Sequence, residues 1–466
     1  MLYVAFGYRN STLRRGLPPR TFKDQMSESI SNTGKGMKLH TKVLLALVIG
    51  ATAGILANTQ FGGLDHPTVA LIEKYLTGPI GQVFLRLLFM IVMPLVFASI
   101  ALGVVGLGDL RKVGRVGGKT IGYFLGTTFL AATFGLVLVL VFDPGAGIPE
   151  DVKTELMATY ASDASSKVVA QESGGFGINT FVNIVTRNPI KSAVDGDMLG
   201  VIFFGLMFGA ALTQLKPETA KPMIDVLQAL NDVVIVIVGM AMKLAPYGVA
   251  GLIFGVTSRF GFALLRPLGG YVLVVLGALI LHLTVNLSLI LRFVIGISPL
   301  VYFSRIRAAL VTAFSTSSSS ATLPAALLAS EKGLGVPPKI AGFVLPLGST
   351  MCMNGTAIFE GITVIFLCQV FGVELSLGGM VIVIVMSVIT AVGAAGVPGG
   401  AIPLLVSILA MFGVPGEAIA IVLGVDRILD MSRTTVNVAG DISATLFVAK
   451  SEGLWDASMV PKQVTT

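Results

Sequence analysis

Charged side chains are scarce in this 466-residue sequence. Asp, Glu, Lys and Arg make up 12% of it, about half of the share in soluble proteins, whereas hydrophobic residues make up 54%. A soluble protein of this length needs a charged surface, so the composition excludes an ordinary cytosolic domain, a disordered chain and a nucleic-acid-binding protein. Long apolar runs with few charges instead predict an all-α polytopic membrane protein.

Cysteine and histidine are also rare. Cys352 and Cys368 lie 16 residues apart in one apolar segment. In a helix this spacing separates them by about 24 Å, which is too far for a disulfide. The three histidines are scattered, and no Cys/His cluster or Ser/His signature is present. We therefore expect neither a metal or other cofactor nor an enzyme of the intramembrane-protease class.

The first 300 residues alternate between polar connections and apolar segments. Residues 1–36 are polar and basic without periodicity, which predicts disorder. Basic residues gather there and in the connection 109–119, which places both on the cytoplasmic side. The segment after Met37 has the form of a signal peptide, but further spans follow it, which favours a retained first span. Apolar segments are expected at 41–58, 79–106, 119–142, 198–214, 229–256 and 269–296.

Beyond residue 298 the apolar segments are interrupted. The arms 300–314 and 321–330 flank a Ser/Thr-rich tip, and each arm is too short to cross about 30 Å of hydrocarbon. This pattern predicts a re-entrant hairpin. The alternative is one long helix, kinked where the serines hydrogen-bond to carbonyls one turn earlier.

The following segments repeat this pattern. A long apolar segment, 340–371, is broken at 351–356, and a second pair of short arms, 378–392 and 401–412, flanks a Gly/Pro turn. The last apolar segment covers 417–449. Two hairpins that each precede a long segment suggest an inverted repeat. Irregular backbone at this depth is tolerated around a protected polar site, which is typical of transporters.

The last segment places five polar residues on one helical face, with spacings of 4, 3, 4 and 4: Asp426, Asp430, Arg433, Asn437 and Asp441. Arg427 lies off this stripe. Ionisable residues in a span face the protein interior and mark a site. One arginine against three aspartates leaves a charge of −2, which favours cations, and a guanidinium favours a carboxylate cargo. The alternative is a self-satisfied ladder in which Asp426 and Asp430 neutralise Arg433.

Glu360 stands alone, about one turn after the break at Asn354. A carboxyl buried by itself favours its neutral form and can carry a proton. The alternative is a glutamate that reaches an aqueous cavity or hydrogen-bonds to a neighbouring helix.

Four motifs occur together: the serine tip Ser317–Ser320 before Pro324, the break at 355–357, the turn at 395–399 and the stripe at 430–441. Together and in this order they resemble the glutamate transporter family, also called the dicarboxylate/amino acid:cation symporter family. The resemblance covers about residues 40–450.

The resemblance implies a fold of eight transmembrane helices plus two re-entrant hairpins with inverted repeats, assembled as a homotrimer. Residues 38–298 would hold the scaffold helices with the third and sixth spans. Residues 299–450 would complete the moving transport core, and 451–466 would form a cytoplasmic tail. It also implies elevator-type motion with the second hairpin as the outer gate. The protein is expected in a bacterial inner membrane, with both termini cytoplasmic.

The resemblance also implies a role for each site residue. Arg433 would bind the cargo's side-chain carboxylate and Asp430 its ammonium, and the pocket would be completed by Asn437, Thr356, Ser319, Thr434 and the Val397 backbone. One Na⁺ would bind Asp441 with the carbonyls of Gly348, Cys352 and Asn437. A second would bind near Thr350, Ala391, Val392 and Ala394, and a third at Thr127, Thr128 and Asn354.

The sequence departs from the family pattern at some of these positions. The usual Asn-Met-Asp-Gly-Thr reads Cys352-Met353-Asn354-Gly355-Thr356, and Phe124 replaces a common tyrosine. The third cation site is therefore predicted to be degenerate. Glu360 resembles the proton carrier of the animal members. The second arginine of some members is absent, because Ser317 and Met431 stand at its two usual positions, and the second hairpin tip is one residue short.

The sequence therefore predicts a secondary symporter of glutamate or aspartate that is driven by Na⁺, H⁺ or both. A C4-dicarboxylate has no ammonium for Asp430. Such a cargo, cystine, a neutral amino acid and anion conduction remain open alternatives.

Overall fold

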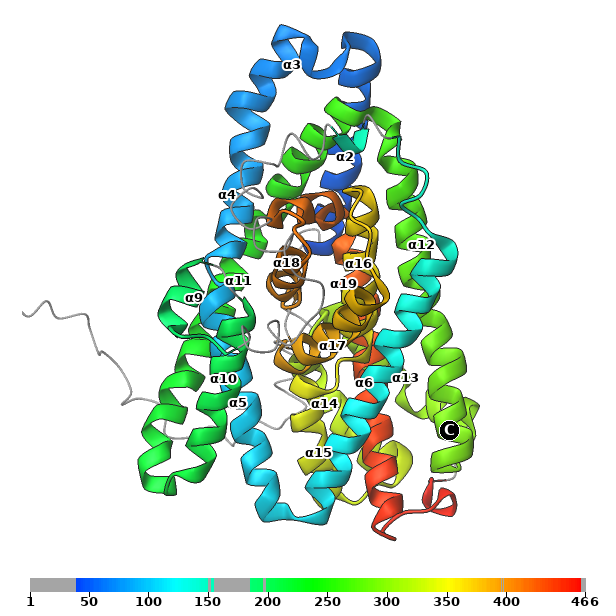
Figure 1. The fold of residues 1–466 in the computed structure, drawn as a ribbon. Helices are drawn as coiled ribbons and strands as arrows, with labels where there is room; N and C mark the ends of the chain where they lie inside the picture. Colours follow the sequence, from blue (N-terminus) through cyan, green and yellow to red (C-terminus); the bar gives the residue numbers. More distant parts are fainter. Residues whose placement is uncertain are drawn as a thin grey trace, which may run out of the picture.

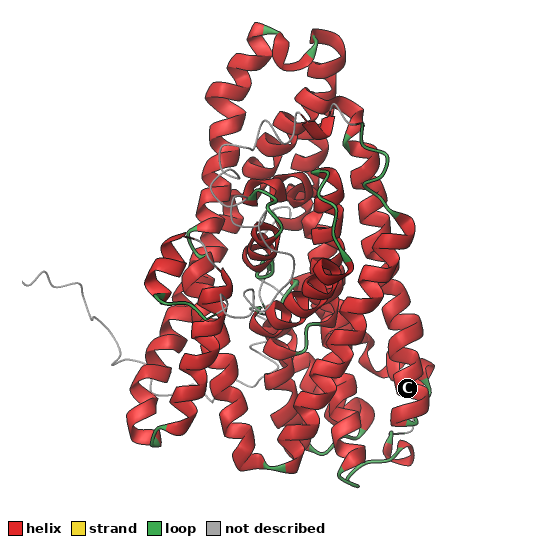
Figure 2. Cartoon of the chain, in the orientation of Figure 1, coloured by secondary structure: helices red, strands yellow, loops and turns green. Residues whose placement is uncertain are grey.

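The computed structural model of the chain describes residues 39–149, 152–154, 185–195, 198–394, 396 and 398–461 (Figure 1). This part of the chain is helical, with short loops and no β-strand (Figure 2). It confirms the all-α class. Residues 1–36 lie outside it, so their disorder stays a prediction.

The first part of the chain forms long helices that pack through small residues. A Cβ added to Gly50 would lie 2.5 Å from the Ala250 carbonyl oxygen, so the backbones of α2 and α11 are in contact. Small residues allow this close approach between apolar helices. The helices of this part are α2 (Leu39–Phe61), α3 (Pro67–Ile72), α4 (Gly78–Phe89), α5 (Val92–Val113), α6 (Arg115–Phe142), α9 (Pro189–Asp195), α10 (Met198–Gln214), α11 (Pro217–Phe260) and α12 (Leu265–Leu281).

The second part is built from shorter helices and one long one. Its helices are α13 (Pro299–Thr316), α14 (Ser319–Leu328), α15 (Pro338–Met351), α16 (Asn354–Val370), α17 (Leu377–Gly393), α18 (Ile402–Met411) and α19 (Ala420–Ser451). Figure 1 shows α16 and α19 at the centre, between α11 and α12. Both helices are buried along almost their whole length.

Six helical segments of the described residues are long and apolar enough to cross a membrane: Thr41–Phe61, Pro67–Val105, Arg115–Phe142, Pro217–Ala263, Leu265–Ile295 and Pro338–Val370. Five of them overlap predicted segments of the first 300 residues, and the remaining predicted segment, 198–214, is the shorter apolar helix α10. Large apolar side chains such as Val48, Phe129 and Leu273 are exposed on their outer faces. Such faces need lipid around them, so the chain is an integral membrane protein.

The predicted interruptions coincide with real breaks. The arms α13 and α14 pack against each other and are joined at Ser317, whose φ of +51° is left-handed. This favours a hairpin over one kinked helix. The predicted break at 351–356 is confirmed, because α15 ends at Met351 and α16 begins at Asn354. The arms α17 and α18 also contact each other across the Gly/Pro turn.

The residues after α19 fold back onto the base of the molecule. The Trp455 indole donates to the Leu334 carbonyl at 2.8 Å and is buried. Glu452 accepts hydrogen bonds from Lys119 at 2.6 Å and from Arg115 at 3.1 Å, both at the start of α6. The tail therefore joins the end of α19 to the start of α6 and to the connection that precedes α15.

Glu452 should make stability depend on pH. The hydrogen bonds from Lys119 and Arg115 lower the pKa of this carboxyl in the folded protein. The contacts therefore stabilise the fold above the ordinary carboxyl pKa and are lost as the pH falls below it. We expect the melting temperature of the purified protein to fall more steeply between about pH 5 and pH 3 than that of Glu452→Gln.

The matched control for this experiment is Asp225→Asn, which removes the exposed Lys221–Asp225 pair. An exposed pair of this kind contributes little, so its melting profile should follow the unsubstituted protein. Identical profiles for the protein and Glu452→Gln would show that the tail contact has no part in acid sensitivity.

Candidate functional site

All five residues of the polar stripe on α19 are buried, each with no more than 6% of its surface exposed. Asp426, Asp430 and Arg433 occupy one end of the stripe and Asp441 the other, with Asn437 between them. The interior position predicted for the stripe is confirmed. Its two ends have different surroundings.

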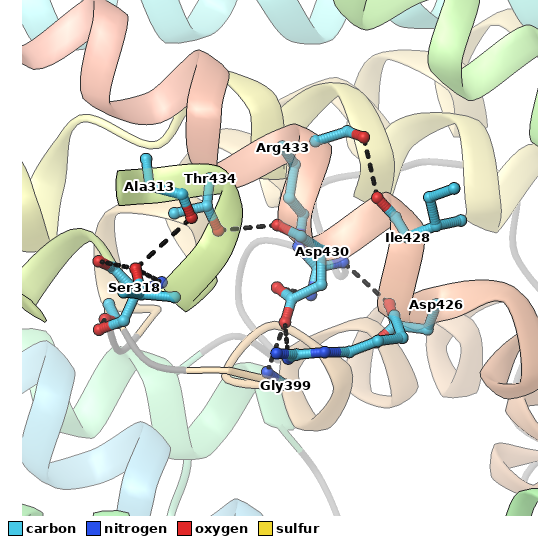
Figure 3. Close-up of polar contacts among 12 residues, drawn as sticks. Ala313, Ser318, Gly399, Asp426, Ile428, Asp430, Arg433 and Thr434 are labelled. Atoms are coloured by element: carbon cyan, nitrogen blue, oxygen red, sulfur yellow. Dashed lines mark hydrogen bonds and ion pairs between the residues drawn. The ribbon is translucent and has the colours of Figure 1, made fainter. Parts of the chain in front are cut away.

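Arg433 lies between two carboxylates (Figure 3). Its Nη1 is 3.1 Å from the Asp426 Oδ1, and its Nη2 is 2.8 Å from the Asp430 Oδ1. The guanidinium carbon stands 4.2 Å from the centre of the Phe359 ring, within the range of a cation–π contact. A buried arginine with these partners is held in one orientation, and its charge is compensated.

Arg427 also belongs to this cluster, although its position on the helix is off the stripe. Its Nη1 is 3.5 Å from the Asp430 Oδ2, and the residue is buried. Asp426, Asp430, Arg427 and Arg433, here called the charge quartet, therefore carry no net charge. Counting Arg427 changes the formal charge of the five-residue stripe from the predicted −2 to −1. The ladder alternative is thus close to the observed geometry at this end.

Both helix-pair tips close over the charge quartet. The Gly399 amide donates to the Asp430 Oδ2 at 3.2 Å. The Ser318 hydroxyl donates to the Gly396 carbonyl at 2.6 Å, and the Ser320 amide donates to the same oxygen at 3.3 Å. The tip of α13–α14 is therefore bonded directly to the tip of α17–α18.

A small cavity lies under these tips, and its volume of about 10 Å³ has room for about one water molecule. An amino acid can therefore enter only if the tips separate. Six of the seven predicted substrate residues line the cavity; Val397 is the exception, because it lies outside the described residues. The six are Ser319, Thr356, Asp430, Arg433, Thr434 and Asn437.

Asn437 fastens the broken helix to α19. Its Oδ1 accepts hydrogen bonds from the Gly355 amide at 2.8 Å and the Thr356 amide at 3.3 Å. Its Nδ2 donates to the Thr356 Oγ1 at 3.1 Å. The side chain thus satisfies amides at the first turn of α16, which have no partner within the helix.

Asp441 differs from the other two aspartates of α19. Its Oδ1 is buried without a hydrogen-bond partner among the described residues. A Cβ added to Gly348 would lie 2.7 Å from this oxygen, so the last turn of α15 touches the carboxylate. Cys352 is fully buried at the end of the same helix. A buried carboxylate with one unpartnered oxygen beside a broken helix is a geometry that a cation would complete.

The predicted second cation site is brought together only in part. Thr350, Val392 and Ala394 line one cavity of about 600 Å³ between α5, α11 and the two tips. Ala391 is buried and is not part of its lining. The Thr350 hydroxyl is engaged with the Leu347 carbonyl at 3.0 Å.

The predicted third cation site contains a neutral hydrogen-bond network. The Asn354 Oδ1 accepts from Thr128 at 2.9 Å and from Thr127 at 3.4 Å. The three side chains meet as the resemblance implied, but none of them carries a charge. Among the described residues, no group of three or more His, Cys, Asp or Glu side chains is placed to hold a metal ion.

Glu360 is fully buried on α16 and links that helix to α17. Its Oε2 accepts a 2.6 Å hydrogen bond from the Thr390 hydroxyl, while Oε1 has no partner among the described residues. The alternative of a hydrogen bond to a neighbouring helix is therefore observed. Sequence reasoning did not identify Thr390, because a threonine in an apolar segment has no periodic signal.

The contact between Gly348 and Asp441 generates a prediction. Gly348→Ala would place a methyl group 2.7 Å from the Asp441 Oδ1 and 3.2 Å from Phe124, which forces the carboxylate to move. Sodium binding is measured as the rise in melting temperature with NaCl, and choline chloride keeps the ionic strength constant. We expect the NaCl concentration for half of this rise to be at least about tenfold higher in Gly348→Ala than in the unsubstituted protein.

Gly342→Ala on the same helix is the matched control, because a methyl group there meets no atom within 4 Å. It should keep the sodium response of the unsubstituted protein. Equal sodium responses in the two variants would contradict a cation at Asp441.

Comparison with known proteins places the chain among symporters. The sequence profile described as the sodium:dicarboxylate symporter family matches residues 39–451. The proton/glutamate-aspartate symporter of Escherichia coli K12 is 34% identical over 89% of this chain and 93% of that protein. The proton/sodium-glutamate symport protein of Bacillus caldotenax is 35% identical, over 88% and 94%. The C4-dicarboxylate transport protein of Bacillus subtilis 168 is 33% identical, over 90% and 96%. A match along nearly the whole length, together with the buried polar stripe, establishes that this chain belongs to the sodium:dicarboxylate symporter family, whose members are transporters.

Proposed function

We propose that the protein is a secondary active symporter that moves aspartate or glutamate together with Na⁺, H⁺ or both. The observation that carries the proposal is the closed cavity, where Arg433 and Asp430 meet four further predicted substrate residues. A guanidinium and a carboxylate side by side are complementary to the carboxylate and ammonium of an amino acid. Relatives named as glutamate-aspartate and sodium-glutamate symporters support this cargo and these cations.

In this proposal the cargo replaces contacts that the protein makes with itself. Its side-chain carboxylate joins Arg433, and its ammonium joins Asp430. Ser319, Thr356, Thr434, Asn437 and the Val397 backbone complete the pocket. Both tips must separate to admit the cargo and close again before it crosses.

In this proposal the coupling cations bind at the other end of the polar stripe. Asp441, with the carbonyls of Gly348, Cys352 and Asn437, would hold one Na⁺. A second would bind where Thr350 approaches the end of α17, near Ala391, Val392 and Ala394. Asn437 belongs to both the cargo site and the first cation site. It ties the break of α15 and α16 to the pocket, which supports coupling between cation and cargo.

The architecture proposed around this site has eight spans and two re-entrant hairpins, α13–α14 and α17–α18. The hairpins, α6, α12, α15–α16 and α19 would move as a transport core against the scaffold helices of a homotrimer. The α17–α18 hairpin would be the outer gate. Both termini would face the cytoplasm across a bacterial inner membrane.

Uptake into proteoliposomes tests the cargo. We expect labelled aspartate and glutamate to accumulate under an imposed sodium or proton gradient. Arg433→Met should lower aspartate affinity at least about a hundredfold, because it removes the cargo's carboxylate partner and leaves the buried Asp426 without its ion pair. Arg307→Met, an exposed position on α13, is the control and should transport normally. Intact uptake by Arg433→Met would refute the pocket assignment.

The two gradients, imposed separately, test Glu360. Glu360→Gln keeps an oxygen to accept the Thr390 hydrogen bond but cannot release a proton. We expect the variant to lose uptake driven by a proton gradient alone and to retain uptake driven by sodium. The sodium-driven rate in the same vesicles is the internal control. Unchanged proton-driven uptake would remove Glu360 from the coupling mechanism.

A further inference from the structure

Arg427 is a buried arginine without an assigned role. It is 7% exposed and lies three residues before Asp430 on the same helix. Its Nε is buried without a hydrogen-bond partner among the described residues. A guanidinium has five donors, and leaving them unmet in a low-dielectric interior is costly. A purely structural role would be expected to use more of them.

The Arg427 contact is the longest of the three that Asp430 makes. Arg433 approaches one carboxylate oxygen to 2.8 Å, while the Gly399 amide at 3.2 Å and Arg427 at 3.5 Å share the other. Arg433 thus engages one Asp430 oxygen, and Arg427 shares with the Gly399 amide the oxygen that remains for a cargo ammonium. Since its contact is the weakest by distance, it is the one most readily exchanged.

We propose that Arg427 is a specificity-determining residue: its guanidinium neutralises Asp430 whenever the cargo brings no ammonium, so the same pocket carries C4-dicarboxylates as well as acidic amino acids. With aspartate, the cargo's ammonium displaces Arg427 from Asp430. With succinate, which has no ammonium, Arg427 keeps its contact with Asp430. The inference rests on the proposed function, because it takes Asp430 as the ammonium partner.

The charge balance of the pocket supports this assignment. The charge quartet is neutral, so a dianionic cargo can enter it without meeting an uncompensated aspartate. Without Arg427 the cluster would carry one negative charge. Aspartate would still bring its own ammonium to Asp430, whereas succinate would leave a buried carboxylate unpaired, which costs several kcal/mol in a protein interior.

Competition between the two cargoes tests the proposal. Uptake of labelled aspartate into proteoliposomes is measured at increasing succinate in the unsubstituted protein, Arg427→Met, Arg427→Gln and Arg427→Lys. We expect both neutral variants to need at least about tenfold more succinate for half-inhibition, a larger factor than any change in the KM for aspartate. Arg427→Lys keeps the charge, so it should stay within about threefold of the unsubstituted protein.

Thermal stabilisation of the purified variants by aspartate and by succinate gives a readout independent of transport. The proposal is overturned if the neutral variants bind aspartate and succinate more weakly by the same factor. It is also overturned if succinate inhibition is unchanged or if neither neutral variant folds.

A lack of competition by succinate in the unsubstituted protein would overturn the proposal as well. In that case aspartate uptake would still support the proposed function. Absence of uptake of either cargo would refute the proposed function itself.

Discussion

The buried Arg433 is the constraint on which the centre of this molecule depends. Taking a guanidinium out of water costs several kcal/mol, and this cost is offset only by carboxylates in close contact and by favourable packing around the group. Asp426 and Asp430 supply the carboxylates, and Phe359 supplies a ring face. A Cβ at Gly355 would lie 2.4 Å from the Arg433 carbonyl, so α16 lies directly against the backbone of α19. The broken helix therefore contacts Arg433 at two places, its backbone through Gly355 and its guanidinium through Phe359.

The interruptions of the helices create the second requirement, because each frees backbone groups inside the apolar core. At the α15–α16 break, Asn437 accepts from two of the freed amides. At the tips, Ser318 and Ser320 donate to the Gly396 carbonyl. Backbone amides and carbonyls that the interruptions leave unpaired are therefore used to join the two hairpins to each other and the broken helix to α19.

Sequence reasoning predicted what depends on length and periodicity. Spans, breaks and the buried stripe follow from runs of apolar residues and from the helical repeat, and motif order located Ser319 and Thr356 at the cavity. It did not identify Arg427, because periodicity describes where a Cα lies, whereas a long side chain reaches a neighbouring face. Thr390 and Gly399 were also missed. Their roles come from contacts between segments distant in sequence, which one chain without its fold does not reveal.

The closure of the tips uses backbone groups of the second hairpin, namely the Gly396 carbonyl and the Gly399 amide. A bond to the main chain is indifferent to the side chain of the residue that provides it. Position 396 is itself restricted to glycine, since a Cβ there would meet the Ser349 carbonyl at 2.6 Å. Gly399 favours glycine as well, because its φ of +75° is left-handed. Neither closure bond uses a side chain of the second hairpin. The other side chains of the turn can therefore change without removing the two bonds that shut the cavity.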